Sequence, residues 1–172
     1  MYLRAAQMAP IKHGGTVSQP TRVLFVCLGN ICRSPMAEGL MLHLVQQRGL
    51  ADQFRIESAG TAAYHQGERP DRRSMAVLQK HGISLNSLAR QVRADDFEDF
   101  DWILAMDASN LRDLEQRCPP HRLDRVHLCL EPVGGDDVPD PYYGGPNGFD
   151  ANYAMLDEAL QLWLDRWLAD VE

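Results

Sequence analysis

The sequence predicts a single α/β domain built around a parallel sheet. Short apolar runs alternate along the chain with segments in which apolar residues recur every three or four positions. This alternation of strand and helix patterns is typical of parallel strands joined by crossover helices. The 172 residues suffice for one domain with a substantial core, and the sequence contains no evident internal repeat or second domain.

Each element has its own pattern. The predicted strands are residues 23–28, 54–57, 102–106 and 126–130. The first of them is continuously apolar, as expected of a strand covered on both faces. Helical spacing of apolar residues predicts helices over residues 37–45, 71–81, 108–114 and 153–167. Asp107 is suited to cap the third helix, and the many Gly, Pro and Asp residues of 131–148 predict a long loop.

Composition narrows the functional classes. The formal net charge of −7 gives no indication of a nucleic-acid partner, and no apolar run is long enough to span a membrane. The four cysteines are too few for a disulfide scaffold and lack the paired spacing of a zinc site. We therefore expect a cytoplasmic protein without a metal or cofactor. Residues 1–20 lack the apolar core of a signal peptide, and we expect a flexible extension before a domain over 21–172.

The loop after the first predicted strand carries the strongest functional signal. Residues 27–35 read Cys-Leu-Gly-Asn-Ile-Cys-Arg-Ser-Pro, between an apolar run and a helical pattern. A thiolate is the nucleophilic form of cysteine, and a helix N-terminus with a nearby guanidinium stabilises it, so we predict Cys27 as the nucleophile. The backbone N–H groups that follow can turn inward as a nest for a phosphate group. The residues of this predicted nest are Leu28, Gly29, Asn30, Ile31 and Cys32.

Neighbouring side chains complete the predicted phosphate site. Arg33 offers a planar guanidinium that can contact two phosphate oxygens at once, which a lysine cannot do. Ser34 is suited to the N-cap of the following helix and Pro35 to its first position, and the Ser34 hydroxyl is also placed to stabilise a thiolate. Gly29 and Asn30 tolerate the tight backbone turn that a nest requires. Cys32 is either a partner that protects Cys27 from overoxidation or a small buried side chain.

A thiolate that attacks a phosphomonoester needs an acid to protonate the leaving oxygen. The loop 131–148 offers four candidates, which are Glu131, Asp136, Asp137 and Asp140. We favour Asp140, because Pro141 stiffens the chain beside it and two tyrosines follow, but the residues alone leave its neighbours open. Cys27, Ser58, Asp107 and this loop all follow the ends of predicted strands, so they are expected to meet in one crevice.

These motifs together resemble the low-molecular-weight protein tyrosine phosphatase family. Besides residues 27–35, the similarity includes Asp-Pro-Tyr-Tyr-Gly at 140–144, Ser-Ala-Gly at 58–60, Ala-Arg-Gln at 89–91 and the segment 103–111. The resemblance extends from about residue 22 to the C-terminus. It implies a four-stranded parallel sheet flanked by helices, with the phosphate-binding loop between the first strand and the first helix. It also implies hydrolysis of phosphotyrosine in proteins through a phosphocysteine intermediate, with phosphate or vanadate as an active-site anion.

The resemblance also assigns roles to individual residues. It implies that Cys27 is the nucleophile, that Arg33 clamps the phosphate, and that Asp140 is the general acid and then the general base. The matching hydrogen-bond network under the loop consists of Asn30, Ser34 and Ser58, and Asp107 is a supporting residue at the end of the third strand. The aromatic walls of the substrate slot match Tyr64 on one side and Tyr142 and Tyr143 on the other.

The sequence also bears on three alternative functions. Protein arginine phosphatases resemble the loop but carry threonine where this chain has Ile31, which favours phosphotyrosine. An arsenate reductase on the same fold needs resolving cysteines after the third strand, where this chain has Ala105, Met106 and Asp107. A non-catalytic phosphopeptide-binding module would need neither Cys27 nor Asp140. The chain departs from the family at Asp71-Arg-Arg, where Asp-Pro-Arg is common, and at Ser87, where some members carry a histidine.

Overall fold

The computed structural model describes residues 19–170 and contains a four-stranded parallel sheet in the order β2-β1-β3-β4. The strands are β1 (Thr21–Cys27), β2 (Phe54–Gly60), β3 (Trp102–Ala105) and β4 (Val126–Leu128). All four predicted strands are present, which confirms the predicted fold class. The flexible extension predicted for residues 1–20 lies, up to residue 18, outside the described residues.

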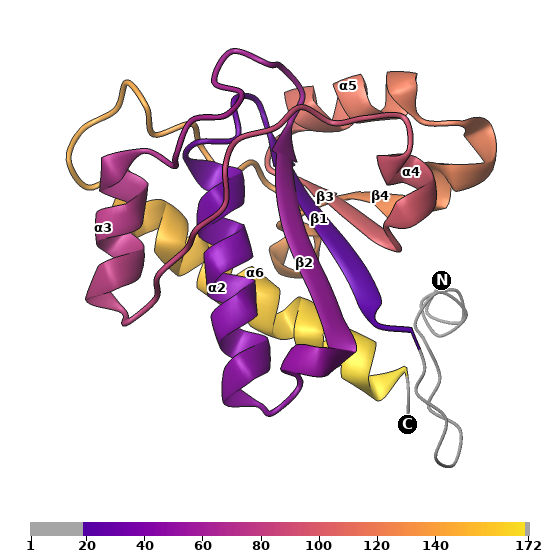
Figure 1. Ribbon diagram of the computed structural model, residues 1–172, viewed down its shortest axis with the longest axis horizontal. Helices are drawn as coiled ribbons and strands as arrows, with labels where there is room; N and C mark the ends of the chain where they lie inside the picture. The colour runs from indigo at the N-terminus through magenta and orange to yellow at the C-terminus, as the bar shows by residue number, and fades with distance from the viewer. Residues whose placement is uncertain (1–18, 171–172) are drawn as a thin grey trace.

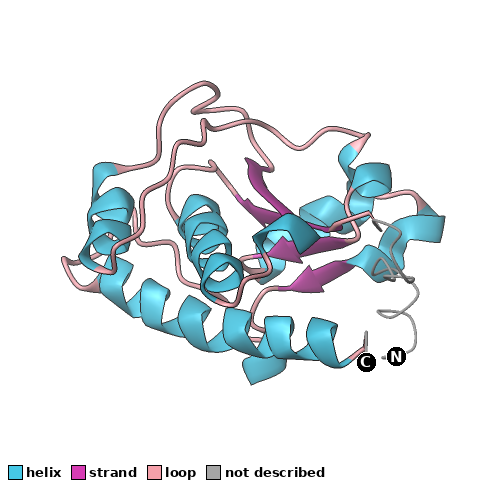
Figure 2. Ribbon diagram, turned by 60° about the horizontal axis from the view of Figure 1, so that its bottom comes forward, coloured by secondary structure: helices cyan, strands magenta, loops and turns pink. Residues whose placement is uncertain are grey.

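Helices cover both faces of the sheet (Figures 1 and 2). The helices are α2 (Arg33–Gln47), α3 (Arg72–Lys80), α4 (Asp96–Asp99), α5 (Ala108–Arg117) and α6 (Gly148–Ala169). Three short 3₁₀ helices within the described residues are η1 (Ala51–Gln53), η2 (Pro120–Arg125) and η3 (Glu131–Val133). In the range 19–170, no helix is both long and apolar enough to cross a membrane.

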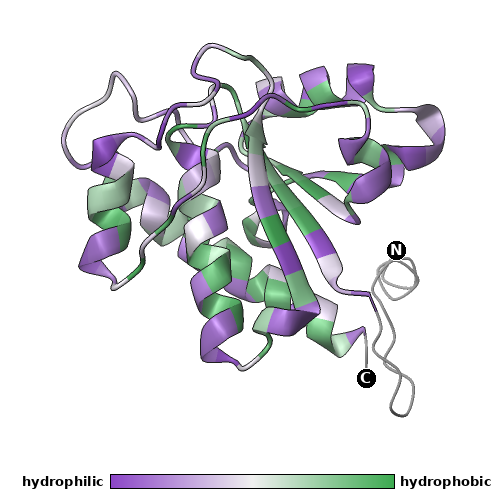
Figure 3. Cartoon of the chain, in the orientation of Figure 1, coloured by the Kyte–Doolittle hydropathy of each residue, from purple (hydrophilic) through white to green (hydrophobic). Residues whose placement is uncertain are grey.

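The sheet separates two apolar cores, because successive β1 side chains point to opposite faces. Val23 and Phe25 lie in the larger core with the inner faces of α2 and α6, and α3 packs outside these two helices. Leu24 and Val26 lie in the smaller core beneath α4 and α5. All four side chains are fully buried, as the continuous apolar run predicted. In Figure 3 the central strands β1 and β3 are mostly apolar, whereas β2 alternates between apolar and polar residues.

The aromatic side chains of the C-terminal helix α6 pack in the larger core and do not form a binding site. Trp163 and Trp167 of α6 lie against Trp102 of β3, with ring centroids 5.5 and 5.6 Å from the Trp102 ring. The indole Nε1 of Trp163 donates to the carbonyl of Cys129 at 2.8 Å. The apolar stripe predicted over residues 153–167 is therefore part of the core.

The end of β2 packs tightly against the loop that follows β1. Gly60 pairs with Cys27 in the sheet register, and its N–H donates to the Arg90 carbonyl at 2.8 Å. A Cβ built on Gly60 would lie 2.6 Å from the Leu28 carbonyl oxygen and 3.2 Å from the Asn30 nitrogen. Both neighbours are backbone atoms, so a side chain at position 60 would displace the loop.

We expect Gly60→Ala to move this loop and to destabilise the protein by about 1–3 kcal/mol, the usual cost of overpacking. Urea unfolding measures the free energy of unfolding. Titration with inorganic phosphate measures the phosphate affinity, which should fall if the loop is displaced. Gly145→Ala is the matched control, because no atom lies within 4 Å of a Cβ at that position. Unchanged phosphate affinity in Gly60→Ala would contradict the predicted displacement.

Candidate active site

A pocket of about 240 Å³ opens where β1 ends and α2 begins. The residues that line it are Cys27, Leu28, Gly29, Ile31, Cys32, Arg33, Tyr64, His65, Asp140, Tyr142 and Tyr143. Eleven residues from three separate loops thus surround one space. This agrees with the prediction that loops at the ends of the strands meet in one crevice. Asn30, Ser34 and Ser58 are buried and support the pocket from beneath without lining it.

The turn of the loop between β1 and α2, predicted to bind phosphate, depends on Asn30. Its φ of 57° is the one positive value at a non-glycine residue between positions 19 and 170. The side chain is fixed on both ends, because Nδ2 donates to Ser34 Oγ at 2.8 Å and to Ser58 Oγ at 2.9 Å, and Oδ1 accepts from the Arg90 N–H at 3.0 Å. Asparagine tolerates this left-handed conformation better than most residues, and the three hydrogen bonds hold it there.

The N-cap expected at Ser34 is wrong. Helix α2 begins at Arg33, two residues before the first position predicted at Pro35, and Cys32, the residue before the helix, makes no side-chain capping bond. The Ser34 hydroxyl instead lies 3.0 Å from Cys27 Sγ and accepts from Asn30 Nδ2, so it contacts the loop rather than capping the helix. This arrangement leaves N–H groups at the start of α2 free of a side-chain cap, beside the pocket.

Arg33 is held rigidly although it lines the pocket. Only 3 % of the residue is exposed, and Nη1 donates to Asp107 Oδ2 at 2.6 Å and to the Val138 carbonyl at 3.0 Å. Burial acts to lower the pKa of Arg33, but Cys27 and Asp107 together raise it above its ordinary value. The guanidinium therefore stays charged and fixed in orientation. Asp107 also caps α5 by accepting from the Asn110 N–H at 2.7 Å, as predicted.

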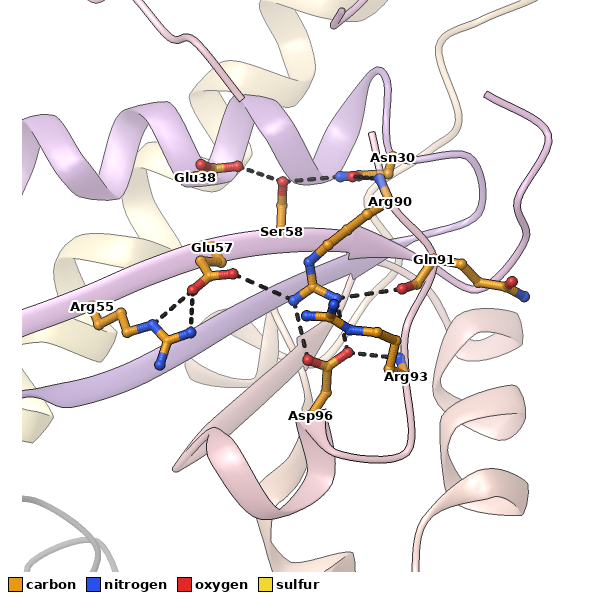
Figure 4. Close-up of polar contacts among 9 residues, drawn as sticks. All are labelled: Asn30, Glu38, Arg55, Glu57, Ser58, Arg90, Gln91, Arg93 and Asp96. Carbon is orange, nitrogen blue, oxygen red and sulfur yellow. Dashed lines mark hydrogen bonds and ion pairs between the residues drawn. The ribbon is translucent and has the colours of Figure 1, made fainter. Parts of the chain in front are cut away.

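Glu38 is a residue of this network that the sequence analysis missed. It is 6 % exposed and accepts a hydrogen bond of 2.5 Å from Ser58 Oγ (Figure 4). A continuous chain of polar contacts thus runs from Glu38 through Ser58, Asn30 and Ser34 to Cys27. Burial raises the pKa of the Glu38 carboxyl, although hydrogen bonds from Ser58 and Ser87 oppose the shift.

A second set of charges holds Asn30 from the opposite side. The guanidinium of Arg90 donates from Nη1 and Nη2 to the two carboxylate oxygens of Asp96, at 2.9 and 3.1 Å, and lies 3.5 Å from Glu57 (Figure 4). Asp96 is 1 % exposed and also accepts from the Arg93 N–H at 2.7 Å. This partly buried ion pair fixes the backbone of Arg90, whose N–H donates to the Asn30 side chain.

Asp140 is the acid of its loop that reaches the pocket. Its carboxylate lies 3.8 Å from Arg33 Nη2 and accepts from the Tyr142 N–H at 3.1 Å. Asp137 instead accepts from the Ala108 N–H at the start of α5, and Glu131 pairs with His127. The structure therefore separates acids that the sequence left as alternatives.

Aromatic side chains surround the pocket mouth. Tyr64 is 75 % and Tyr143 is 94 % exposed, and the rings of Tyr142 and Tyr143 meet edge to face at 4.8 Å. His65 also lines the mouth, and no sequence pattern singled it out. A Cβ on Gly29 would lie 3.0 Å from His65 Cδ2, so the glycine allows the imidazole to lie over the loop.

Cys32 lines the pocket together with Cys27. Cys32 is 6 % exposed, and burial together with the nearby Asp71 raises its pKa to about 12. It is therefore held as a thiol at neutral pH. Its protective role toward Cys27 stays a prediction.

Comparison with known proteins identifies the family. The family model described as "Low molecular weight phosphotyrosine protein phosphatase" matches residues 22–172. A relative of that name from Schizosaccharomyces pombe is 47 % identical over 147 residues, which are 83 % of this chain and 94 % of the relative. The chain belongs to the low-molecular-weight phosphotyrosine protein phosphatase family, and it is accordingly a cysteine-based phosphatase that hydrolyses phosphoric monoesters.

Solved structures agree with this assignment. A protein tyrosine phosphatase from Entamoeba histolytica superposes with a TM-score of 0.83 at 37 % identity, over 87 % of this chain and 97 % of that one. A Drosophila arginine phosphatase superposes with a TM-score of 0.78 at 39 % identity, over 83 % and 95 %. The shared fold thus spans two substrate specificities.

We expect Glu38→Gln to change the pH dependence of stability. The pKa of Glu38 is raised in the folded protein. Its favourable contribution to the free energy of unfolding is therefore complete below the ordinary pKa of 4.5, and it is lost as the pH rises through the folded pKa. The glutamine cannot ionise. The free energy of unfolding of Glu38→Gln minus that of the wild type should therefore increase by about 1 kcal/mol or more between about pH 5 and pH 8.

Urea unfolding at the two pH values measures this difference. Glu115→Gln is the matched control, since that side chain lies on the exposed side of α5. A difference that stays constant with pH, or one that Glu115→Gln reproduces, would contradict the assignment to Glu38.

Proposed function

We propose that Cys27 is the nucleophile with which this phosphatase acts on phosphotyrosine. Its Sγ lies 3.0 Å from Ser34 Oγ, and Cys27 lines the pocket together with Arg33, whose guanidinium is fixed. The sulfur attacks phosphorus as a thiolate, an S–P bond forms, and the P–O bond to the tyrosine oxygen breaks. The loop N–H groups and Arg33 bind the phosphate oxygens on which charge develops. The observation that carries this proposal is a thiol held inside a preformed anion site.

Asp140 is proposed as the general acid and then the general base. In the first step its carboxyl group gives a proton to the departing phenolic oxygen. In the second step its carboxylate takes a proton from water, which attacks phosphorus, and the S–P bond breaks to release phosphate and the Cys27 thiolate. Its place in the pocket, 3.8 Å from Arg33, supports both roles. Inorganic phosphate and vanadate are the corresponding active-site anions.

The walls of the pocket support selectivity for an aromatic phosphate. Tyr64, Tyr142 and Tyr143 offer apolar faces to a flat ring above the phosphate site. Protein arginine phosphatase activity is the second candidate, because the Drosophila arginine phosphatase is 39 % identical to this chain, close to the 37 % of the Entamoeba histolytica tyrosine phosphatase. Ile31 favours phosphotyrosine, since it lines the pocket without a hydroxyl that could contact a guanidinium.

Two further assignments are part of this proposal. The catalytic domain comprises residues 21–172, which the family match over 22–172 supports, with residues 1–20 as an extension. We also infer a cytoplasmic location, because each of the four cysteines is a free thiol and free thiols persist in a reducing compartment.

A substrate panel tests the nucleophile and the specificity together. A phosphotyrosine peptide should exceed phosphoserine and phosphoarginine peptides in kcat/KM by about 100-fold or more, because only the aryl group fills the walls. Cys27→Ser should lose at least about 10³-fold in turnover yet still bind vanadate. Cys118→Ser, a buried cysteine outside the pocket, is the control. Faster phosphoarginine hydrolysis would select the second candidate, and an active Cys27→Ser would refute the nucleophile.

The role of Asp140 is tested by the leaving group. Phenoxide needs a proton in the transition state, whereas p-nitrophenoxide departs with little help. In single turnovers Asp140→Asn should slow phosphoenzyme formation from phenyl phosphate by about 10²-fold or more, and much less from p-nitrophenyl phosphate. Asp136→Asn, an exposed neighbour in the same loop, is the control. Equal slowing of both substrates would exclude Asp140 as the acid.

A further inference from the structure

We propose that Arg73, at the start of α3, is a positioning residue that holds the loop carrying Asp140 in place over the phosphate-binding loop. The inference rests on the proposed role of Asp140. It assigns to α3 a part in the reaction, although Arg73 does not line the pocket.

The start of α3 is joined directly to the phosphate-binding loop. The Asp71 N–H donates to the Ile31 carbonyl at 2.7 Å, and the Ser74 hydroxyl donates to the Cys32 carbonyl at 2.9 Å. Ser74 is fully buried, so this second contact is protected from water. The first turn of α3 therefore occupies a fixed position relative to the loop that binds phosphate.

Asp71 sets the direction in which Arg73 points. Its carboxylate accepts from Arg73 Nε and Nη2, both at 3.0 Å, in a bidentate pair, and also caps the helix by accepting from the Arg73 N–H at 2.8 Å. The hydrogen bonds from Arg73 hold the pKa of Asp71 below its ordinary range. The guanidinium plane is thereby fixed, and Nη1 is directed away from Asp71.

That remaining donor reaches the acid-bearing loop. Arg73 Nη1 donates to the Tyr142 carbonyl at 3.1 Å, and the guanidinium carbon lies 5.3 Å from the Tyr142 ring centroid and 4.6 Å from that of Phe149. Tyr142 in turn donates its N–H to Asp140 Oδ1 at 3.1 Å. One peptide segment thus receives a hydrogen bond from Arg73 and gives one to the catalytic carboxyl group.

The other side of Asp140 is anchored independently. The buried amide of Asn152 donates to the Pro139 carbonyl at 2.8 Å, and the Val138 N–H donates to the Met106 carbonyl at 2.8 Å. Asp140 therefore lies between a segment tied to the core and a segment tied to α3. Without Arg73 the loop would be anchored on the first side only, and the carboxyl group would lose its fixed distance from the leaving oxygen.

The chemistry of the contact requires an arginine. The guanidinium makes a bidentate ion pair, donates a further hydrogen bond and lies against two aromatic rings at the same time, which an ammonium group cannot do. Because the Arg73 side chain is 48 % exposed, its ion pair should contribute little to global stability. A positioning role and a merely structural role therefore predict different results.

The test compares Arg73→Ala and Arg73→Lys with the wild type by the leaving-group dependence of phosphoenzyme formation in single turnovers. We expect phenyl phosphate to react at least about tenfold more slowly in both variants, with a change of less than about threefold for p-nitrophenyl phosphate. Phosphate inhibition and the urea midpoint should stay close to the wild type. Arg72→Ala is the matched control, because it removes a neighbouring exposed arginine. Should Arg73→Ala not fold, Arg73→Lys and Arg73→Gln decide the question.

A double-mutant cycle shows through which residue Arg73 acts. In an Asp140→Asn background, Arg73→Ala should add no further difference between the two substrates. A leaving-group effect that persists there, an equal loss on both substrates, or the same result in Arg72→Ala would overturn the proposal. If Asp140→Asn alone lacks the effect, the proposed acid fails and this inference fails with it. If Asp140→Asn has the effect and Arg73→Ala does not, only the role of Arg73 is refuted.

Discussion

The left-handed backbone of Asn30 is the constraint on which the active site depends. A loop between a buried strand and a helix has few residues in which to turn its N–H groups toward a phosphate, and one of them must adopt a positive φ. The left-handed conformation costs asparagine less free energy than it costs most larger residues, but the side chain still needs hydrogen-bond partners that hold it there. Ser34, Ser58 and the Arg90 backbone supply them, and each comes from a different segment of the chain.

This requirement explains why buried charge gathers around a loop that is itself nearly uncharged. Arg90 is fixed by Asp96, Ser58 by Glu38, and Arg33 by Asp107. Each pair or hydrogen bond orients a group that contacts the loop, and the close packing of Gly60 against the Leu28 carbonyl prevents the loop from relaxing. Burying charged groups costs free energy unless they are paired, and even a paired group adds little net stability. The network therefore serves mainly to fix the geometry of the loop.

The fold and the central residues of the site could be predicted from local patterns. An apolar run buried on both faces, the residues 27–35 and the Asp-Pro-Tyr-Tyr segment are all contiguous, so their signal survives in one sequence. Even Glu38 had a local signal, since it lies on the apolar face of a helix at helical spacing from Ser34. The N-cap at Ser34 was wrong because a tertiary contact with Cys27 competes for the hydroxyl.

The remaining residues could not be found because their roles depend on contacts between distant segments. His65 reaches the loop only because Gly29 leaves space for its ring. Arg73 contacts Tyr142, 69 positions away, and nothing near either residue in the sequence indicates that pairing. Such contacts follow from where the crossover helices place their ends, which periodicity alone does not determine.

The electrostatics of the pocket give these geometric constraints their importance. Arg33 is the one permanently charged cation among the residues that line the pocket, and two carboxylates, Asp107 and Asp140, lie within 4 Å of its guanidinium. The whole chain is also acidic, with a formal net charge of −7. An incoming phosphate dianion therefore gains little from the net charge of the pocket. Besides the Arg33 guanidinium it needs the aligned N–H groups of the loop and the start of α2, whose contribution falls steeply with distance. A loop that depends on alignment in this way cannot be allowed to move, which accounts for the number of segments that hold it.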